Sequence, residues 1–249
     1  MKIIMSPAKK MRQDYDSLAP LSFPVFKDEA KEILNYLKSL SSYELQKLWG
    51  CSDKIAQQNI ERLDYMDLES SLTPAVLSYD GIAFQYMAPS AFEYSDFDYI
   101  QSHLRILSGF YGVLKPMDGV TPYRLDMENK AKVKGTKDLY EFWGDKLYKE
   151  TIDDDRTIIN LASKEYSKCI EKYLSPKDTF ITCVFAETVK GKLTQKATFA
   201  KMARGEMVRY LAENKIEDPV KMKDFSRLDF HFRSDLSSET EYIFERIPK

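Results

Sequence analysis

Basic residues directly follow the first apolar run of the chain. The run "KIIM" at residues 2–5 leads into "SPAKKMR", which places Lys9, Lys10 and Arg12 just after a predicted strand. Loops that leave strand ends are where α/β proteins commonly place ligand contacts. We expect this loop to contact an anion such as a phosphate group, and a solvated basic loop is the alternative.

A second candidate is the corner "LQKLWGCSDKIAQQNI", residues 45–60. Apolar spacing predicts two short helices joined by a tight turn at Gly50, a helix-hairpin-helix element over about 42–62. The N–H groups of such a turn, and the positive end of the second helix, can hold a DNA phosphate without reading any base. Ser52 stands where such hairpins usually carry a second glycine, and Asp53 is acidic. A corner that merely packs is the alternative.

The third candidate, "LRILSGFYGVLKPMDGVTPYRLDM", combines glycines with Arg105, Lys115 and Arg124, among which Tyr111 and Tyr123 are interleaved. Arginine forks match phosphate oxygens, and tyrosine rings can stack on bases. Glycine lets a backbone pass close to its neighbours. We interpret the segment as a tight crossing of the chain that presents basic residues at its ends.

A fourth candidate is the amphipathic pattern "KATFAKMARGEMVRY", which predicts a helix with Lys201, Arg204 and Arg209 spread over its polar side. Gly205 in mid-helix costs about 1 kcal/mol relative to alanine, so we expect a packing or close-approach reason for it. The polar side is either a phosphate-contacting surface or an ordinary solvated face.

No familiar catalytic arrangement stands out, because GxSxG, P-loop, GxGxxG and HExxH motifs are all missing from the sequence. Ser6 and Lys9 are spaced for a Ser–Lys pair. Paired carboxylates occur at 96–98 and 153–155, in segments that read as helix ends or turns. We therefore predict no catalytic residue.

Composition narrows the classes of protein further. The net charge of −2 provides no overall basic field, so nucleic-acid binding would need a local patch. Two isolated histidines, His103 and His231, predict no metal site, and we expect no cofactor. The odd number of scattered cysteines indicates free thiols in a reducing compartment. Because no run approaches the ~20 apolar residues of a membrane span, and no secretory signal is visible, we expect a cytoplasmic protein.

Hydrophobic periodicity predicts a mixed α/β fold in one domain, residues 1–249. The predicted strands are "KIIM", "PAVLSYDG", "RILS", "RTIINLAS", "TFITCVFAETV", and a hairpin of "RLDFHFRS" with "EYIFERI". One predicted helix begins at Phe26, and a second, short one ends at Gly50. Two more follow N-caps at Ser52 and Ser95. The last three cover 138–152, 164–174 and 195–215.

Seven blocks between residues 6 and 207 resemble the YaaA family of bacterial peroxide-stress proteins: "SPAK", "SDKIA", "LRILSGFYGVLKPMD", "PYRLDM", "KDLYEFWGD", "INLASKEY" and "FAKMARGEM". The resemblance implies a single α/β domain of unusual topology with a positively charged cleft and a helix-hairpin-helix element. It also implies a cytoplasmic protein that binds DNA and helps limit oxidative damage linked to intracellular iron. The DNA-binding candidates on the matching blocks are Lys9, Gly50, Ser52, Lys54, Arg105, Lys115, Arg124, Lys201, Arg204 and Arg209.

Three hypotheses remain at this point. The leading one is a peroxide-response protein that binds double-stranded DNA mainly through phosphates. The alternative is an enzyme acting on a small nucleotide or nucleobase-like substrate in the same basic cleft, which a narrow, enclosed pocket would favour over a broad groove. An iron-handling protein is the third, and the poor spacing of metal-ligand residues argues against it.

Overall fold

Strand β1 (Lys2–Met5) lies at the centre of the main sheet. Its residues Ile3, Ile4 and Met5 are at most 1% exposed, as expected of an apolar, β-branched strand covered on both faces. β1 pairs in parallel with β3 (Leu104–Ser108) on one side and with β6 (Thr157–Leu161) on the other. The first residues of the chain therefore join the two halves of the sheet.

The computed structural model describes residues 1–14, 16 and 18–247, and in this part of the chain eight strands form one mixed sheet. The strand order is β4-β3-β1-β6-β7-β10-β9, with β8 paired to β7. The inner five strands are parallel, and β4, β8 and β9 are antiparallel to their neighbours. The other strands are β4 (Gly112–Leu114), β7 (Thr179–Val189), β8 (Lys192–Thr194), β9 (Phe230–Phe232) and β10 (Glu241–Arg246), while β2 (Thr73–Pro74) and β5 (Gly119–Val120) form a separate pair.

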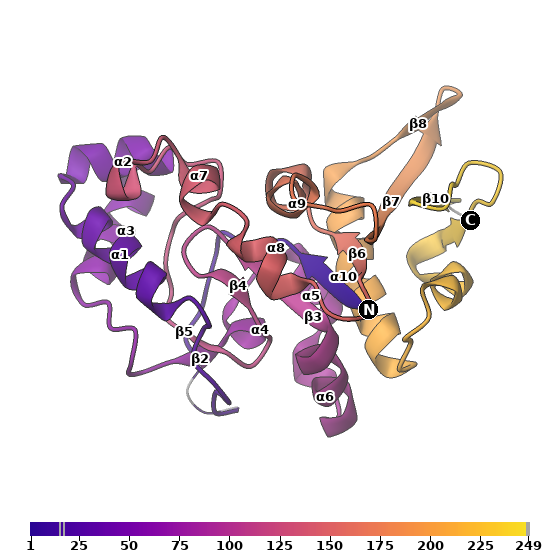
Figure 1. Ribbon diagram of the computed structural model, residues 1–249, viewed down its shortest axis with the longest axis horizontal. Helices are drawn as coiled ribbons and strands as arrows, with labels where there is room; N and C mark the ends of the chain where they lie inside the picture. The colour runs from indigo at the N-terminus through magenta and orange to yellow at the C-terminus, as the bar shows by residue number, and fades with distance from the viewer. Residues whose placement is uncertain (15, 17, 248–249) are drawn as a thin grey trace.

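Helices flank this sheet, and α1, α2, α3 and α7 gather at the left of the view in Figure 1. The α-helices are α1 (Lys27–Lys38), α2 (Ser42–Trp49), α3 (Asp53–Asp64), α4 (Ala75–Ser78), α5 (Ile82–Met87), α6 (Tyr94–His103), α7 (Leu139–Trp143), α8 (Lys146–Thr151), α9 (Lys164–Glu171) and α10 (Ala197–Glu213). Short 3-10 helices are η1 (Pro89–Ala91), η2 (Val133–Gly135), η3 (Pro219–Asp224) and η4 (Arg227–Asp229). The predicted mixed α/β class is thus confirmed.

Three local predictions were wrong. The segment "PAVLSYDG" is mostly the short helix α4, because the N–H groups of Ala75 and Val76 donate to the 116–118 turn and leave no strand ladder. The predicted helix over 138–152 is broken into α7 and α8 at Gly144, which has φ +53°. Helix α6 is capped by Glu93, not Ser95, in a reciprocal capping box.

The glycine-rich segment at 107–118 forms the end of β3, a turn and the edge strand β4. Ser108 holds this turn, because its Oγ accepts the N–H groups of Phe110 at 3.1 Å and Tyr111 at 2.9 Å. The same hydroxyl lies 2.6 Å from the Tyr123 hydroxyl, which lies 2.8 Å from that of Tyr79. The segment is therefore a buried hairpin tied to the next part of the chain by a hydroxyl chain.

Helix α10 packs closely against α5, and Gly205 makes this approach possible. A Cβ atom at position 205 would collide with the carbonyl oxygen of Ala83 and would lie 3.0 Å from the backbone nitrogen of Met87. The mid-helix glycine therefore has the close-approach role that the sequence predicts. This contact fixes where the polar residues of α10 lie relative to the start of α5.

We predict that Gly205→Ala lowers the free energy of unfolding by about 2 kcal/mol, because overpacking against α5 outweighs the gain of about 1 kcal/mol from the better helix former. Urea unfolding measures the change. Thr198→Ala, at the exposed start of the same helix, is the matched control and should change stability by less than about 0.5 kcal/mol. A Gly205→Ala variant as stable as the wild type would contradict this account of the contact.

Candidate functional site

The strand order reverses between β1 and β6. From β1 the chain moves to β3 on one side, and then returns to β6 on the other side and continues outward to β7 and β10. In open α/β sheets, ligands bind in the crevice beyond the carboxyl ends of the strands at such a switch point. The residues that follow β1 and β6 are therefore the first place to look for a site.

A pocket of about 420 Å³ lies at this point. Its wall combines the loop after β1, the loop after β6, the start of α5 and one side of α10. The polar and charged lining residues are Ser6, Lys9, Lys10, Asp80, Asp126, Ser163, Glu165, Lys201 and Arg204, and the apolar ones include Met5, Pro7, Ile82, Ala83, Phe84 and Tyr166.

Two serines join the loops that follow β1 and β6. The Ser6 Oγ accepts the backbone N–H of Ser163 at 2.8 Å and donates to the Ser163 Oγ at 3.1 Å. Lys9 does not pair with Ser6, because its Nζ lies 2.7 Å from Asp126 Oδ2. The Ser–Lys pair that the spacing allows is thus not formed, and the two hydroxyls are polar groups at the floor of the crevice.

Arg204 and Lys201 supply positive charge that the protein itself does not neutralise. Neither side chain has an ion-pair partner among the described residues, and the buried Nε of Arg204 makes no hydrogen bond there. Burial lowers the pKa of Arg204 because it penalises the charged form. Arg204 is half-buried, and its buried Nε without a hydrogen-bond partner is costly. An anionic ligand would relieve that cost.

The other two lysines of the pocket are paired with carboxylates. Lys10 lies 2.5 Å from Asp80, and this hydrogen bond lowers the pKa of the Asp80 carboxyl. Lys9 pairs with Asp126, and the side chains of Lys9 and Lys10 are 67% and 78% exposed. The charges of Lys9 and Lys10 are therefore largely neutralised by their carboxylate partners and exposed to solvent, whereas Arg204 is half-buried.

The α2–α3 corner carries three of the predicted DNA contacts. Gly50 ends α2 in the left-handed region with φ +55°, which suits glycine at a helix end. Ser52 is the N-cap of α3, although its side chain makes no capping hydrogen bond. Lys54 is exposed, and the Asp53 carboxylate accepts a hydrogen bond from Gln46 at 2.5 Å.

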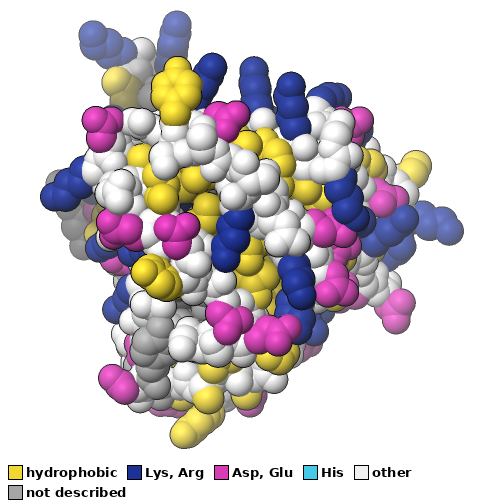
Figure 2. Space-filling view, turned by 90° about the vertical axis from the view of Figure 1, so that its left-hand side faces the viewer, with side chains coloured by type: hydrophobic (Ala, Val, Ile, Leu, Met, Phe, Trp, Pro, Cys, Tyr) yellow, Lys and Arg dark blue, Asp and Glu magenta, His cyan; other side chains and the backbone are white. Residues whose placement is uncertain are grey.

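The charge at this end of the molecule is mixed. Figure 2 shows lysine and arginine side chains along the upper edge, with aspartate and glutamate scattered among and below them. A continuous basic face is not seen in this view. Any phosphate contact here would therefore rest on a few side chains and not on a broad field.

The remaining basic candidates lie apart from the switch-point pocket. Arg105 is 6% exposed, and its Nη1 donates to the carbonyl oxygens of Leu104 and Gln101. Lys115 is exposed after β4, and Arg124 is half-buried. Arg209 forms an ion pair at 2.7 Å with Glu213 on the same helix. Of the ten predicted contacts, Lys9, Lys201 and Arg204 are brought together in the pocket.

Sequence reasoning missed the contribution of Ser163 and Glu165. Both follow "RTIINLAS", the clearest predicted strand, so the rule that ligand groups lie after parallel strands could have found them. Glu165 Oε1 accepts the N–H of Glu128 at 3.2 Å. Burial raises the pKa of Glu165, and the nearby charges of Asp126 and Glu128 add to the rise.

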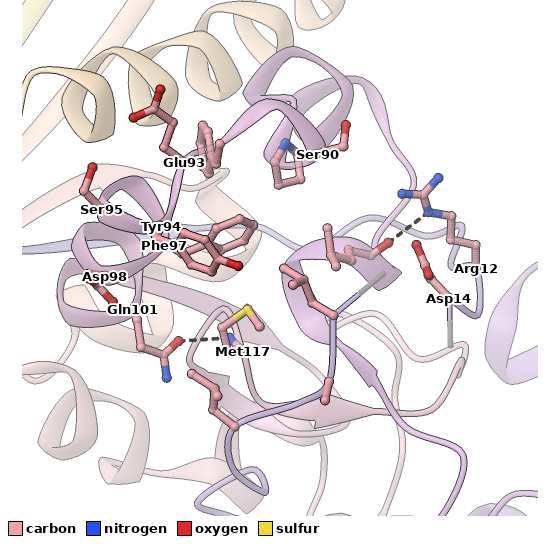
Figure 3. A pocket seen from close by; sticks show the side chains of 16 residues that line it. Arg12, Asp14, Ser90, Glu93, Tyr94, Ser95, Phe97, Asp98, Gln101 and Met117 are labelled. Atoms are coloured by element: carbon pink, nitrogen blue, oxygen red, sulfur yellow. Dashed lines mark hydrogen bonds between the residues drawn. The ribbon is translucent and has the colours of Figure 1, made fainter. Parts of the chain in front are cut away.

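A larger cavity of about 1100 Å³ lies beside α6. Figure 3 shows Glu93, Tyr94, Phe97 and Gln101 on one side of it and Arg12 on the other, where the Arg12 Nε donates to the Leu77 carbonyl at 2.9 Å. Among its described lining residues Arg12 is the only cation, and several others are acidic or aromatic. It offers less to an anion than the switch-point pocket does.

Thiols and metal ligands add little to these sites. All three cysteines are free, and burial raises the pKa of Cys169 to about 12 and also raises that of Cys183, which makes both poor nucleophiles. Within residues 1–14, 16 and 18–247, no group of three His, Cys, Asp or Glu side chains is placed to hold a metal ion. In the same residues, no helix is long and apolar enough to cross a membrane.

The raised pKa of Glu165 predicts a pH dependence of stability. The folded state holds the Glu165 proton more tightly than the unfolded chain, so this contribution is complete below the ordinary value of 4.5 and is lost as the pH rises through the folded-state pKa. Glutamine at position 165 does not ionise, so the Glu165→Gln variant does not lose this stability as the pH rises. The stability of the variant relative to the wild type should therefore increase with pH above about 4.5, as followed by urea unfolding. A difference that stays constant with pH would contradict this.

Comparison with known proteins places the chain in a family. The sequence profile described as "Peroxide stress protein YaaA" matches residues 1–236. A UPF0246 protein of Agathobacter rectalis is 63% identical over 246 residues, which are 99% of each chain. UPF0246 proteins of Lachnoclostridium phytofermentans and Limosilactobacillus reuteri are 52% and 50% identical, over 98% and 99% of this chain and 96% and 100% of theirs. The chain therefore belongs to the YaaA family of peroxide stress proteins.

Proposed function

We propose that this peroxide stress protein binds double-stranded DNA, mainly through its phosphates, and helps limit iron-linked oxidative damage. Two exposed lysines outside the switch-point pocket support the proposal: Lys54 beside the α2–α3 corner and Lys115 after β4. Neither has an ion-pair partner among the described residues, so each can neutralise a phosphate without first breaking an internal pair.

The geometry of the α2–α3 corner is the observation that carries the proposal. Gly50 is exposed, and the side chain of Ser52 leaves the first N–H groups of α3 uncapped. A helix start with open N–H groups and a neighbouring lysine is suited to a phosphate oxygen. The hydrogen bond from Gln46 holds the Asp53 carboxylate against α2 at this corner.

Contacts of this kind fix the position of a protein on DNA but read no sequence. The mixed charge of the surface and the net charge of −2 favour the affinity range of non-specific binding, with Kd roughly 10⁻⁴ to 10⁻⁶ M at physiological salt. Binding that protects DNA during peroxide stress needs coverage more than sequence preference, which agrees with this chemistry.

We predict a salt-dependent affinity for duplex DNA. If Lys54 and Lys115 each neutralise one phosphate, the slope of log K against log salt concentration is about −1.8 or steeper. Fluorescence anisotropy of a labelled duplex, measured from about 20 to 200 mM salt, gives the slope. No binding at the lowest salt, or an affinity independent of salt, would contradict the proposal.

Single charge removals locate the contacts. Lys54→Gln and Lys115→Gln should each make the slope less steep by about 0.9 and weaken binding to all duplex sequences alike. Lys192→Gln, which removes an equal charge from the exposed strand β8, is the matched control and should leave the slope unchanged. If the Lys54 variant behaves as this control does, the corner does not contact DNA.

A further inference from the structure

We propose that the switch-point pocket binds the phosphate monoester of a small molecule, of the size of a nucleoside 5′-monophosphate, at a site separate from the DNA contacts. This inference goes beyond DNA binding, because it rests on the switch-point pocket and not on the α2–α3 corner. Its observations are the unpaired cations of α10, the two linked serines and the apolar side chains that also line the pocket.

The charges of the pocket favour an anion. Two of its four cations, Lys9 and Lys10, are already paired with Asp126 and Asp80. Lys201 and Arg204 have no such partner in the described part of the chain, and the one further carboxyl group of the lining is that of Glu165, whose pKa is raised by burial. A phosphate monoester carries about −1.5 to −2 charges at neutral pH, whereas a DNA phosphodiester or a carboxylate carries one.

Hydrogen-bond donors are available for the phosphate oxygens. The planar guanidinium of Arg204 is suited to two oxygens at once, and its Nε is buried without a partner. The Ser6 Oγ accepts the N–H of Ser163 and donates its own proton to the Ser163 Oγ, which leaves the proton of the Ser163 hydroxyl for a ligand. An arriving phosphate oxygen can therefore accept a hydrogen bond from a serine hydroxyl while the loops after β1 and β6 stay linked.

The size and the apolar wall define the rest of the ligand. A volume of about 420 Å³ lies within the usual range for small-molecule sites. Ile82, Phe84 and Tyr166 also line the pocket, and their side chains suit a flat or apolar body. Asp126 and Glu165 offer carboxylate oxygens to hydroxyl groups such as those of a sugar.

Gly205 connects this site to the fold. The close approach of α10 to α5 lays Lys201 and Arg204 beside residues 81–84, which form one wall of the pocket. Because the glycine and the arginine are adjacent, the contact that packs the helix also positions the guanidinium. The burial of Arg204 is thus a consequence of the packing.

Calorimetric titration of the full chain with adenosine 5′-monophosphate and with adenosine, at equal ionic strength, tests the proposal. We expect the monophosphate to bind at least about tenfold more tightly than the nucleoside, and Arg204→Gln to remove roughly 10- to 100-fold of that affinity. Lys201→Gln, at an exposed position that cannot disturb the core, should weaken binding several-fold, and Lys192→Gln should not. Equal binding of the two ligands, binding of neither, or unchanged affinity in the Lys201 and Arg204 variants would overturn the proposal.

Competition separates this site from the DNA contacts. Saturating monophosphate should leave the affinity for a labelled duplex within about twofold at constant ionic strength, and Lys54→Gln should leave monophosphate binding unchanged. If the monophosphate displaces DNA competitively, the pocket is a phosphate subsite for DNA and the proposal of a separate site is wrong. If the wild-type chain binds the monophosphate but does not bind DNA, only the proposed function is contradicted.

Discussion

The parallel pairing of β1 with both β3 and β6 is the constraint on which the rest of the structure depends. This buried strand of four residues joins two halves of the sheet that come from different parts of the sequence. Because β3 and β6 lie on opposite sides of β1, the chain must cross from one side of this strand to the other after β3. The three strands are parallel, so the loops after β1 and β6 meet at the same edge of the sheet. The switch-point pocket follows from that pairing, with Ser6 and Ser163 linking its two loops.

The packing of α10 gives this pocket its charge. Gly205 allows the helix to lie against α5, and the neighbouring Arg204 is thereby enclosed without a counter-ion among the described residues. A half-buried charge with an unsatisfied buried donor is unfavourable, and proteins keep such groups chiefly where a function uses them. The more exposed lysines serve a different purpose, since Lys54 and Lys115 lie where a large ligand can reach them.

Local features of the fold were predictable because they depend on short-range periodicity. The strands β1, β6 and β7, the long helix α10 and the β9–β10 hairpin all follow from apolar patterns in the sequence. The segment "PAVLSYDG" failed because its backbone bonds to a distant turn, which no local pattern reveals. The grouping of Lys9 with Arg204, and the burial of Arg105, depend on the order of strands in the sheet. That order is set by contacts between segments far apart in the chain, so spacing alone could not rank the ten candidate residues.

The most direct test of the central claim is a crystal structure of the full chain soaked with adenosine 5′-monophosphate. The account predicts a phosphate group within hydrogen-bond distance, about 3 Å, of the Arg204 guanidinium and the Ser163 hydroxyl, with the base against apolar side chains of the pocket such as Ile82 and Phe84. A pocket that stays empty at saturating ligand, with Arg204 turned to pair with a protein carboxylate, would contradict it.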